Sequence, residues 1–313
     1  MIRIETASAC NLRCQHCTTG VAYGSTDRRV MRMETFDRVI DQINRVPTIK
    51  RAVLYLGGEP LLNKNHALMC KRIKQETNIR RTKFVTNGML IDEEWCDKLA
   101  DADVDSISIS IDGLSPAEHN VLRTRSDFET IRKNVWLLKN RFEQKGCQTK
   151  IQLGNTQIKR TNDPKRAIVP DFLAKEFPGF DIGSGYAMVW PGMEAEDTGL
   201  DGLTVEHKSA RNFCDHPFFD LAIRANGDII LCCYDISGKH VMGNVMKDEI
   251  LDVYQSEAYV DLRRAMTKGD KAGVPEICRK CSNFTGSTFN RAPDAVLQLV
   301  TPRSTIPHKA SVK

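Results

Sequence analysis

Three cysteines near the amino terminus have a spacing that suits an iron-sulfur cluster. Cys10, Cys14 and Cys17 form a CxxxCxxC run within one short loop. Such a loop can wrap around one cubane, giving three thiolates to a 4Fe-4S cluster and leaving the fourth iron without a protein ligand. Zinc is the competing hypothesis, but structural zinc takes four closed ligands, and His16 is too close in sequence to supply the fourth. The run therefore predicts a cluster with one reactive iron.

Glycine-bearing turns follow the next predicted strands. Gly57-Gly58-Glu59-Pro60 ends one apolar run, Asn87-Gly88 ends a strand further on, and Ser110 to Gly113 ends another. Glycine lets a backbone approach a ligand closely, and carboxylate or carbonyl oxygens can receive an ammonium group. We expect chemistry where these turns meet, at the carboxyl ends of the strands.

Taken together, the cysteine run and the GGEP segment resemble the radical S-adenosylmethionine (SAM) superfamily. The resemblance implies that SAM chelates the open iron and that its reductive cleavage yields a 5'-deoxyadenosyl radical, which abstracts a hydrogen atom from a substrate. It also implies which residues bind SAM. The amino group would lie at Gly57, Gly58 and Glu59, and the ribose or carboxylate near Asn87 and Ser110.

One arginine is also implied by the resemblance. Arg123 matches a family arginine that pairs with the SAM carboxylate, but Arg125 stands two residues away and the local pattern does not decide between them. Asp112 ends a Ser-Ile-Asp-Gly segment that resembles the branch of the superfamily with auxiliary clusters.

A second group of cysteines lies in the last third of the chain. Cys214, Cys232, Cys278 and Cys281 resemble the SPASM/Twitch extension of radical SAM enzymes. In the short Twitch form four cysteines bind one auxiliary 4Fe-4S cluster, and no cysteine follows Cys281, so the resemblance implies one auxiliary cluster. The competing hypothesis is a structural zinc ribbon, because two pairs of cysteines also suit tetrahedral zinc.

Cys233 stands beside the expected ligand Cys232. Similar radical SAM epimerases of peptides and of an aminoglycoside are thought to use a nearby cysteine as hydrogen-atom donor, so Cys233 is the candidate donor here. The alternative is an idle, partly buried thiol. The sequence does not decide which of the two neighbours binds the cluster.

The rest of the chain predicts an α/β fold that positions these groups. Phe36, Val39, Ile40 and Ile43 recur at the spacing of an amphipathic helix. Six strand-helix units in succession imply a parallel sheet with right-handed crossovers, and six are too few to close an eight-stranded barrel, so we expect a partial (β/α)6 TIM-like barrel. The expected strands are 2–6, 51–56, 83–86, 104–112, 150–159 and 180–189, and the expected helices are 33–46, one from about 66, 91–102, 128–145 and 171–177.

A small C-terminal α+β domain is expected after the barrel. Asn226-Gly227 between apolar residues signals a hairpin, and two short helices are expected at 248–255 and 259–267. We place the barrel at 1–200 with a Gly- and acid-rich linker at 191–202, the auxiliary domain at 205–290 and a tail at 291–313.

Composition limits the function classes. The chain has 313 residues, 41% of them hydrophobic, and its formal net charge of +5 is spread without a dense basic run, so we expect no nucleic-acid partner. Without a membrane-length apolar run or an export signal, a cytoplasmic protein is expected. Its 11 cysteines then indicate metal or redox chemistry, because the cytosol keeps thiols reduced.

The leading hypothesis is a maturase that oxidises, crosslinks or epimerises a ribosomally made peptide. Because the chain starts directly at its first strand, a leader-peptide recognition protein would be a separate partner, and an electron donor such as flavodoxin or ferredoxin is also implied. A radical SAM dehydrogenase or epimerase of an aminocyclitol or sugar is the alternative. A cysteine-rich zinc-binding interaction protein is the alternative from another class. The substrate itself is not marked by any motif.

Overall fold

The computed structural model describes residues 1–21, 28–46, 48–160, 162–188, 190–191, 213–281 and 284. The predicted linker beyond Pro191, the predicted tail and residue 189 of the sixth predicted strand lie outside the described residues.

A curved sheet of nine strands organises the fold. The predicted parallel strands are all present and lie side by side in chain order, each paired in parallel with the next. The partial-barrel architecture is therefore confirmed. These strands are β1 (Ile2–Ile4), β3 (Arg51–Val53), β4 (Arg81–Thr86), β5 (Ser106–Ser110), β7 (Lys150–Gln157) and β8 (Asp181–Tyr186).

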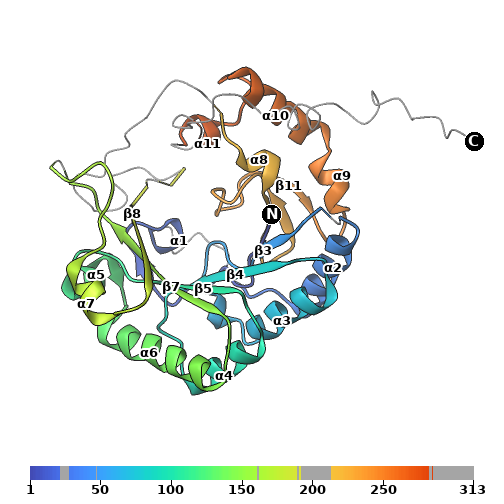
Figure 1. The fold of residues 1–313 in the computed structure, drawn as a ribbon. Coiled ribbons are helices and arrows are strands. Elements are labelled where there is room, and N and C mark those ends of the chain that lie inside the picture. The colour runs from blue at the N-terminus through green and yellow to red at the C-terminus, as the bar shows by residue number, and fades with distance from the viewer. Residues whose placement is uncertain are drawn as a thin grey trace, which may run out of the picture.

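Helices cover the outside of this sheet (Figure 1). The predicted apolar stripe of α2 is buried. Both ends of α6 have local signals: the Asp127 carboxylate accepts the Thr130 N–H, and Gly146 has a φ of +65° just after the helix. The helices are α2 (Met33–Asn44), the 3-10 helix η1 (Pro60–Leu62), α3 (His66–Glu76), α4 (Glu93–Asp101), α6 (Phe128–Gln144) and α7 (Asp171–Glu176).

Four short elements near the carboxyl ends of the strands were not predicted. Helix α1 (Thr18–Val21) follows the cysteine run, and α5 (Pro116–Leu122) follows β5. Strand β2 (Arg13–Cys14) pairs antiparallel with β6 (Arg123–Thr124), which places Cys14 opposite Arg123. Their brevity explains the omission, because two-residue strands carry no periodic pattern.

The C-terminal strands continue the barrel sheet instead of forming a separate one. The predicted Asn-Gly hairpin is present, with β9 (Leu221–Ile223) and β10 (Asp228–Ile230) antiparallel, and β11 (Val241–Asn244) follows. Strand β9 pairs in parallel with β1, in the register Ile4 to Ile223, and so covers an edge that β1 would otherwise expose. Helices α8 (His216–Phe219), α9 (Ile250–Tyr254), α10 (Glu257–Lys268) and α11 (Glu276–Arg279) complete this part.

The two faces of the sheet differ in chemistry. In β5, Ile107 and Ile109 are fully buried, while the alternating serines, including Ser110, are half-buried. The apolar face packs on the outer helices, and the serine face leaves a polar interior. Within the described residues, no helix has the length and apolar character needed to cross a membrane.

Candidate iron-sulfur and cofactor sites

One cavity of about 340 Å³ gathers every residue that was predicted for the first cluster and for SAM. The β-strands deliver most of them, because the loops after β1, β3, β4 and β5 meet at the same end of the sheet. The predicted residues that line the cavity are Cys10, Cys14, Cys17, Gly57, Gly58, Glu59, Asn87, Ser110 and Arg123.

The cysteine loop is held by its own backbone. The Cys10 Sγ accepts the Leu12 N–H at 3.4 Å, and the Cys17 N–H donates to the Cys14 carbonyl at 3.2 Å. Gly20 lies so close that a Cβ there would stand 2.2 Å from the Cys14 carbonyl oxygen. Burial raises the pKa of Cys10 to about 11 and that of Cys14 to about 12. Such thiols become thiolates only beside a cation, so the donor set fits an iron cluster.

Glu59 organises the GGEP segment from within. Its Oε1 accepts the Leu61 N–H at 3.1 Å and the Thr86 hydroxyl at 2.7 Å, and its Oε2 accepts the Asn87 N–H at 2.7 Å. Burial raises the pKa of this 2% exposed carboxyl, although those hydrogen bonds act to lower it. Glu59 thus locks the turns after β3 and β4 to each other beside the three cysteines.

Asp112 is a buried residue with several polar partners, and its sequence motif did not indicate them. Its Oδ2 lies 3.0 Å from His16 Nε2 and 2.6 Å from Arg123 Nε, and its Oδ1 accepts the Thr156 N–H at 2.9 Å. Burial would raise the pKa of Asp112, but Arg123 and His16 outweigh it and hold that pKa well below the ordinary value. The Ser-Ile-Asp-Gly segment marks this aspartate in the sequence, but it does not indicate that His16 and Arg123 are its partners.

The structure also separates the two arginines. Arg123 lines the cavity, whereas Arg125 has a φ of +75° and is not among the described lining residues. His16 also lines this cavity, and its buried Nδ1 has no hydrogen-bond partner among the described residues.

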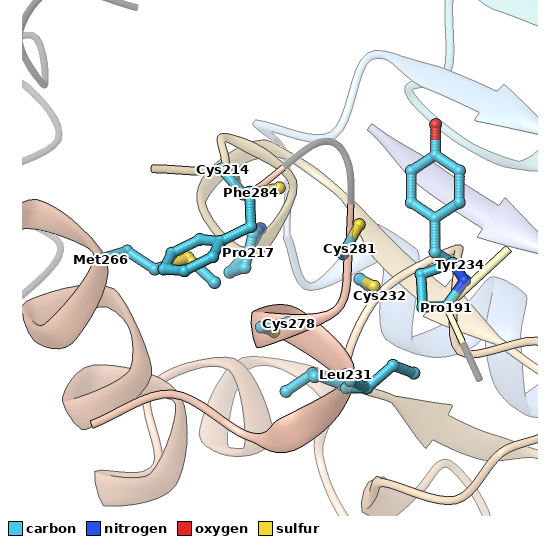
Figure 2. Close-up of a pocket in the computed structure, with 11 residues that line it drawn as sticks. Pro191, Cys214, Pro217, Leu231, Cys232, Tyr234, Met266, Cys278, Cys281 and Phe284 are labelled. Carbon is cyan, nitrogen blue, oxygen red and sulfur yellow. The ribbon is translucent and has the colours of Figure 1, made fainter. Parts of the chain in front are cut away.

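A second cavity, of about 20 Å³, gathers the four C-terminal cysteines. Figure 2 shows Cys214, Cys232, Cys278 and Cys281 around one space, with Leu231, Met266 and Phe284 beside them. Burial raises the pKa of the Cys278 thiol to about 12 and raises that of Cys232 as well. Three buried thiols and the half-buried Cys232 in an apolar cavity suit a closed, fully ligated cluster.

Cys233 does not line the cavity of these four cysteines. Its Sγ lies 3.7 Å from His216 Nδ1, which is itself 2.8 Å from Asp220 Oδ2, and Cys233 is not among the described residues that line either cavity. Although burial lowers the pKa of His216, Asp220 and Cys233 together raise it to about 10. The structure therefore groups Cys232, and not Cys233, with the other three cysteines. The donor role of Cys233 stays a prediction.

Several lining residues of the first cavity had no sequence signal. Tyr186 ends β8, and Met188 and Trp190 follow it. Ile236 comes from the segment between β10 and β11, and Tyr55 follows β3. No motif marks such positions, because specificity depends on shape and not on a shared cofactor.

Two family matches cover most of the chain. Residues 4–154 match the radical SAM superfamily, and residues 214–282, which include all four C-terminal cysteines, match the SPASM iron-sulfur cluster-binding domain. The chain belongs to the radical SAM superfamily. SAM and 4Fe-4S clusters are therefore the cofactors of this radical SAM chain, and the thiols of its two cavities fit them.

Curated relatives match about half of this radical SAM protein or less. It is 29% identical over 160 residues to a GTP 3',8-cyclase of Alkaliphilus metalliredigens, which is 50% of this chain and 45% of the relative. It is 35% identical over 116 residues to a GTP 3',8-cyclase of Heliobacterium modesticaldum, 37% of this chain and 35% of the relative. The chain thus spans about half or less of the length of these relatives.

Solved structures share the fold over nearly the whole chain. BtrN in complex with AdoMet and 2-DOIA has a TM-score of 0.60 at 17% identity, covering 90% of this chain and 92% of BtrN. The enzyme anSMEcpe with bound AdoMet also has a TM-score of 0.60, at 15% identity, covering 91% and 84%. SuiB of Streptococcus suis, bound to the precursor peptide SuiA, has a TM-score of 0.56 at 16% identity, covering 92% and 74%.

Proposed function

We propose that this radical SAM enzyme abstracts a hydrogen atom from a ribosomally made peptide and thereby oxidises, crosslinks or epimerises it. The observation that carries the proposal is the unassigned part of the first cavity. Apart from the cysteines and the SAM motifs, its described lining includes Tyr186, Met188, Trp190 and Ile236, together with Leu12, His16, Tyr55, Leu56, Val85, Thr86, Thr156 and Ala187. Aromatic and aliphatic walls recognise an apolar side chain by packing.

The charge of the cavity argues against a nucleoside triphosphate. Among the described lining residues, Arg123 alone carries a permanent positive charge, and Asp112 already pairs with it at 2.6 Å. Triphosphates are bound by clusters of cations or by backbone N–H groups at a helix N-terminus. The GTP 3',8-cyclase relatives therefore support the radical chemistry in this chain more than they support GTP as its substrate.

A sugar or aminocyclitol fits the same walls less well. Recognition of several hydroxyl groups needs several side-chain donors and acceptors. The Tyr186 hydroxyl already donates to the Pro164 carbonyl at 2.9 Å, and Met188 and Ile236 offer no hydrogen-bond donor, although Tyr55, Trp190 and Thr156 of the same lining carry one each. The likeness to BtrN supports this alternative through fold alone. A sugar or aminocyclitol is therefore the substrate class that replaces the peptide if the peptide test fails.

Each group of residues has a proposed role. Cys10, Cys14 and Cys17 hold the first cluster, and Arg123, oriented by Asp112, binds the SAM carboxylate. When bound, the cluster and SAM supply one-electron cleavage of SAM and hydrogen-atom abstraction. The chain supplies position and a site from which water is excluded. An electron donor such as flavodoxin or ferredoxin and a separate leader-peptide recognition protein are the proposed partners.

The test follows the mass of a peptide. Short peptides encoded beside the gene are treated anaerobically with enzyme, SAM and reductant in deuterated water. A gain of about one mass unit means inversion with a solvent-exchangeable donor, and a loss of about two means oxidation or crosslinking, as cofactor-borne radical chemistry requires. The Cys14→Ala enzyme is the control and should leave every peptide unchanged.

The proposed role of the aromatic and aliphatic lining of the first cavity has a test of its own. Trp190→Ala should raise the KM for the peptide about tenfold, because truncating a buried aromatic anchor costs ~1.4 kcal/mol or more of binding, while 5'-deoxyadenosine formation without peptide is retained. If no peptide changes but SAM is still cleaved, and an aminocyclitol is oxidised instead, the peptide assignment is wrong and the small-molecule alternative replaces it.

A further inference from the structure

Glu5 connects the first cavity to the C-terminal hairpin. It directly follows β1, is 1% exposed, and its N–H donates to the Ile223 carbonyl at 2.8 Å. Its two carboxylate oxygens face different parts of the chain: Oε1 accepts the Gly57 N–H at 3.2 Å, and Oε2 accepts the Ala225 N–H at 3.0 Å. One buried side chain thus joins a barrel loop to the turn between β9 and β10.

On the barrel side, Gly57 is held from three directions. Glu5 takes its N–H, and its carbonyl accepts the Thr19 hydroxyl of α1 at 2.5 Å. A Cβ on Gly57 would stand 2.5 Å from the Ile236 Cγ2. The first residue of the GGEP segment is therefore fixed by the helix after the cysteine run and by the segment that follows Cys232.

On the C-terminal side, the same carboxylate leads toward Cys232. The Arg224 Nε lies 3.8 Å from the Glu5 Oε2, and a Cβ on Gly238 would stand 2.3 Å from the Arg224 Nη1. Arg224 therefore lies against the segment 232–240. That segment is compact, because the fully buried Asp235 accepts the N–H groups of Lys239 at 3.0 Å and His240 at 2.8 Å.

We propose that Glu5 is a positioning residue that couples the SAM-binding cavity to the auxiliary cysteine site. The two backbone hydrogen bonds to the Glu5 carboxylate form together only when the Gly57 loop and the Ala225 turn keep one relative arrangement. Breaking either hydrogen bond leaves the buried carboxylate charge of Glu5 poorly solvated. SAM binding beside Gly57 then changes the equilibrium between conformations at Cys232. By thermodynamic linkage, a change at Cys232 alters the affinity for SAM by the same factor as SAM alters the equilibrium at Cys232. The inference rests on the placing of SAM at Gly57, and it needs no peptide.

Glu5→Gln tests the coupling with almost no change in size. The amide keeps one oxygen acceptor but turns an NH2 toward the other backbone N–H, so only one of the two bonds survives. We expect the Kd for SAM to rise about tenfold, measured by its effect on the EPR signal of the reduced first cluster. We also expect the EPR signal of the auxiliary cluster to stop responding to SAM, while the iron content stays that of the unaltered enzyme.

Two further variants keep the proposal falsifiable. Asp105→Asn removes a carboxylate that accepts the Thr82 N–H at 2.7 Å and hydroxyl at 2.9 Å; it should leave the SAM Kd and both EPR signals unchanged. Gly238→Ala pushes on Arg224 from the C-terminal side and, because Gly238 has a φ of +67°, also strains the backbone of the segment 232–240; it should raise the SAM Kd several-fold. If Glu5→Gln does not fold, Gly238→Ala decides by itself.

The contrary outcomes are distinct. Unchanged SAM affinity in folded Glu5→Gln and Gly238→Ala overturns the proposal. So does weaker SAM binding in Glu5→Gln with an auxiliary signal that still responds to SAM, because Glu5 would then serve the Gly57 loop alone. Failure of the peptide assay changes neither the SAM Kd nor the EPR signals. The proposed function can therefore be wrong while the proposed coupling is correct.

Discussion

The two cysteine cavities of this protein differ in volume, polarity and number of thiols. The first is about 340 Å³, holds three cysteines and is lined by Arg123, which pairs with the buried Asp112 behind it. The second is about 20 Å³, holds four cysteines and is otherwise lined mainly by apolar side chains. Three thiols with room beside them leave an iron open to a ligand, whereas four thiols in a tight apolar space complete the coordination. We interpret the first as the reactive site and the second as an electron-transfer or structural site.

Removing one thiol from the first cavity should give the largest effect. Cys14→Ala is expected to abolish formation of 5'-deoxyadenosine, because a cluster held by two thiolates is lost, while the second site keeps about four irons per chain. Product is measured by chromatography and iron by colorimetry after anaerobic reconstitution. Cys96→Ala, at a fully buried thiol of α4, is the control and should retain SAM cleavage. Retained cleavage in Cys14→Ala would refute the assignment of the first site.

The second cavity separates the neighbouring cysteines. Cys232→Ala should lose about four irons per chain, because Cys232 is grouped with the other three thiols and a three-thiol set in so small a space has no substitute ligand. Cys233→Ala should keep both the iron and SAM cleavage, because its thiol faces His216. If Cys233→Ala loses the iron instead, then Cys233, and not Cys232, is the cluster ligand. Loss of peptide inversion alone in Cys233→Ala would establish the donor role.

Neutralising Asp112 should weaken the first cavity without affecting the second. Asp112→Asn leaves Arg123 without its ion-pair partner, so we expect the Kd for SAM to rise about tenfold, or ~1.4 kcal/mol. Titration of the first cluster's EPR signal with SAM measures the change. The auxiliary signal in the absence of SAM is the internal control and should be unchanged. Equal SAM affinity would mean that Arg123 needs no orientation by Asp112.

Acid should affect the two parts in opposite directions, with the smallest effect of the four. Burial lowers the pKa of His66 to about 3 and that of His119 to about 4, so both are neutral when folded but bind protons below about pH 6.5 when unfolded. Their contribution to stability is complete above that pH and falls as the pH drops. His216, whose folded pKa is raised to about 10, contributes most below pH 6.5.

Hydrogen exchange at pH 7 and pH 5, corrected for intrinsic rates, checks this difference. Amides of α3 and α5 should lose protection at pH 5, and those of α8 should not. His66→Gln should reduce the loss in α3, because a glutamine carries no titrating charge. Equal loss in all three helices would show that cluster breakdown, and not histidine protonation, governs the acid response.

Local signals explain what the sequence could predict. Asp127 and Gly146 delimit α6 through contacts within a few residues, and Asn226-Gly227 forms its hairpin in the same way. The site motifs also follow local rules, since each ends a strand and parallel strands bring their carboxyl ends together. The first cavity therefore contains all its predicted residues.

Long-range pairing explains what was missed. The β2–β6 ladder that sets Cys14 opposite Arg123 is two residues long, and Asp112 acquires its importance only through His16 and Arg123. The union of β9 with β1 joins residues from the two ends of the described chain, and nothing in either segment indicates the other. Glu5 was passed over for the same reason, because its two amide partners lie in distant segments.

The position of β1 also sets the order of folding. It lies inside the sheet, paired with β3 on one edge and with β9 on the other. During synthesis its second edge stays uncovered until residues 221–223 have left the ribosome. Pairing over such a separation raises the contact order and slows folding. The first cysteine loop follows β1 directly, so iron delivered before β9 docks would meet an incomplete site, and assembly of the first cluster should wait until residues 221–223 have been synthesised.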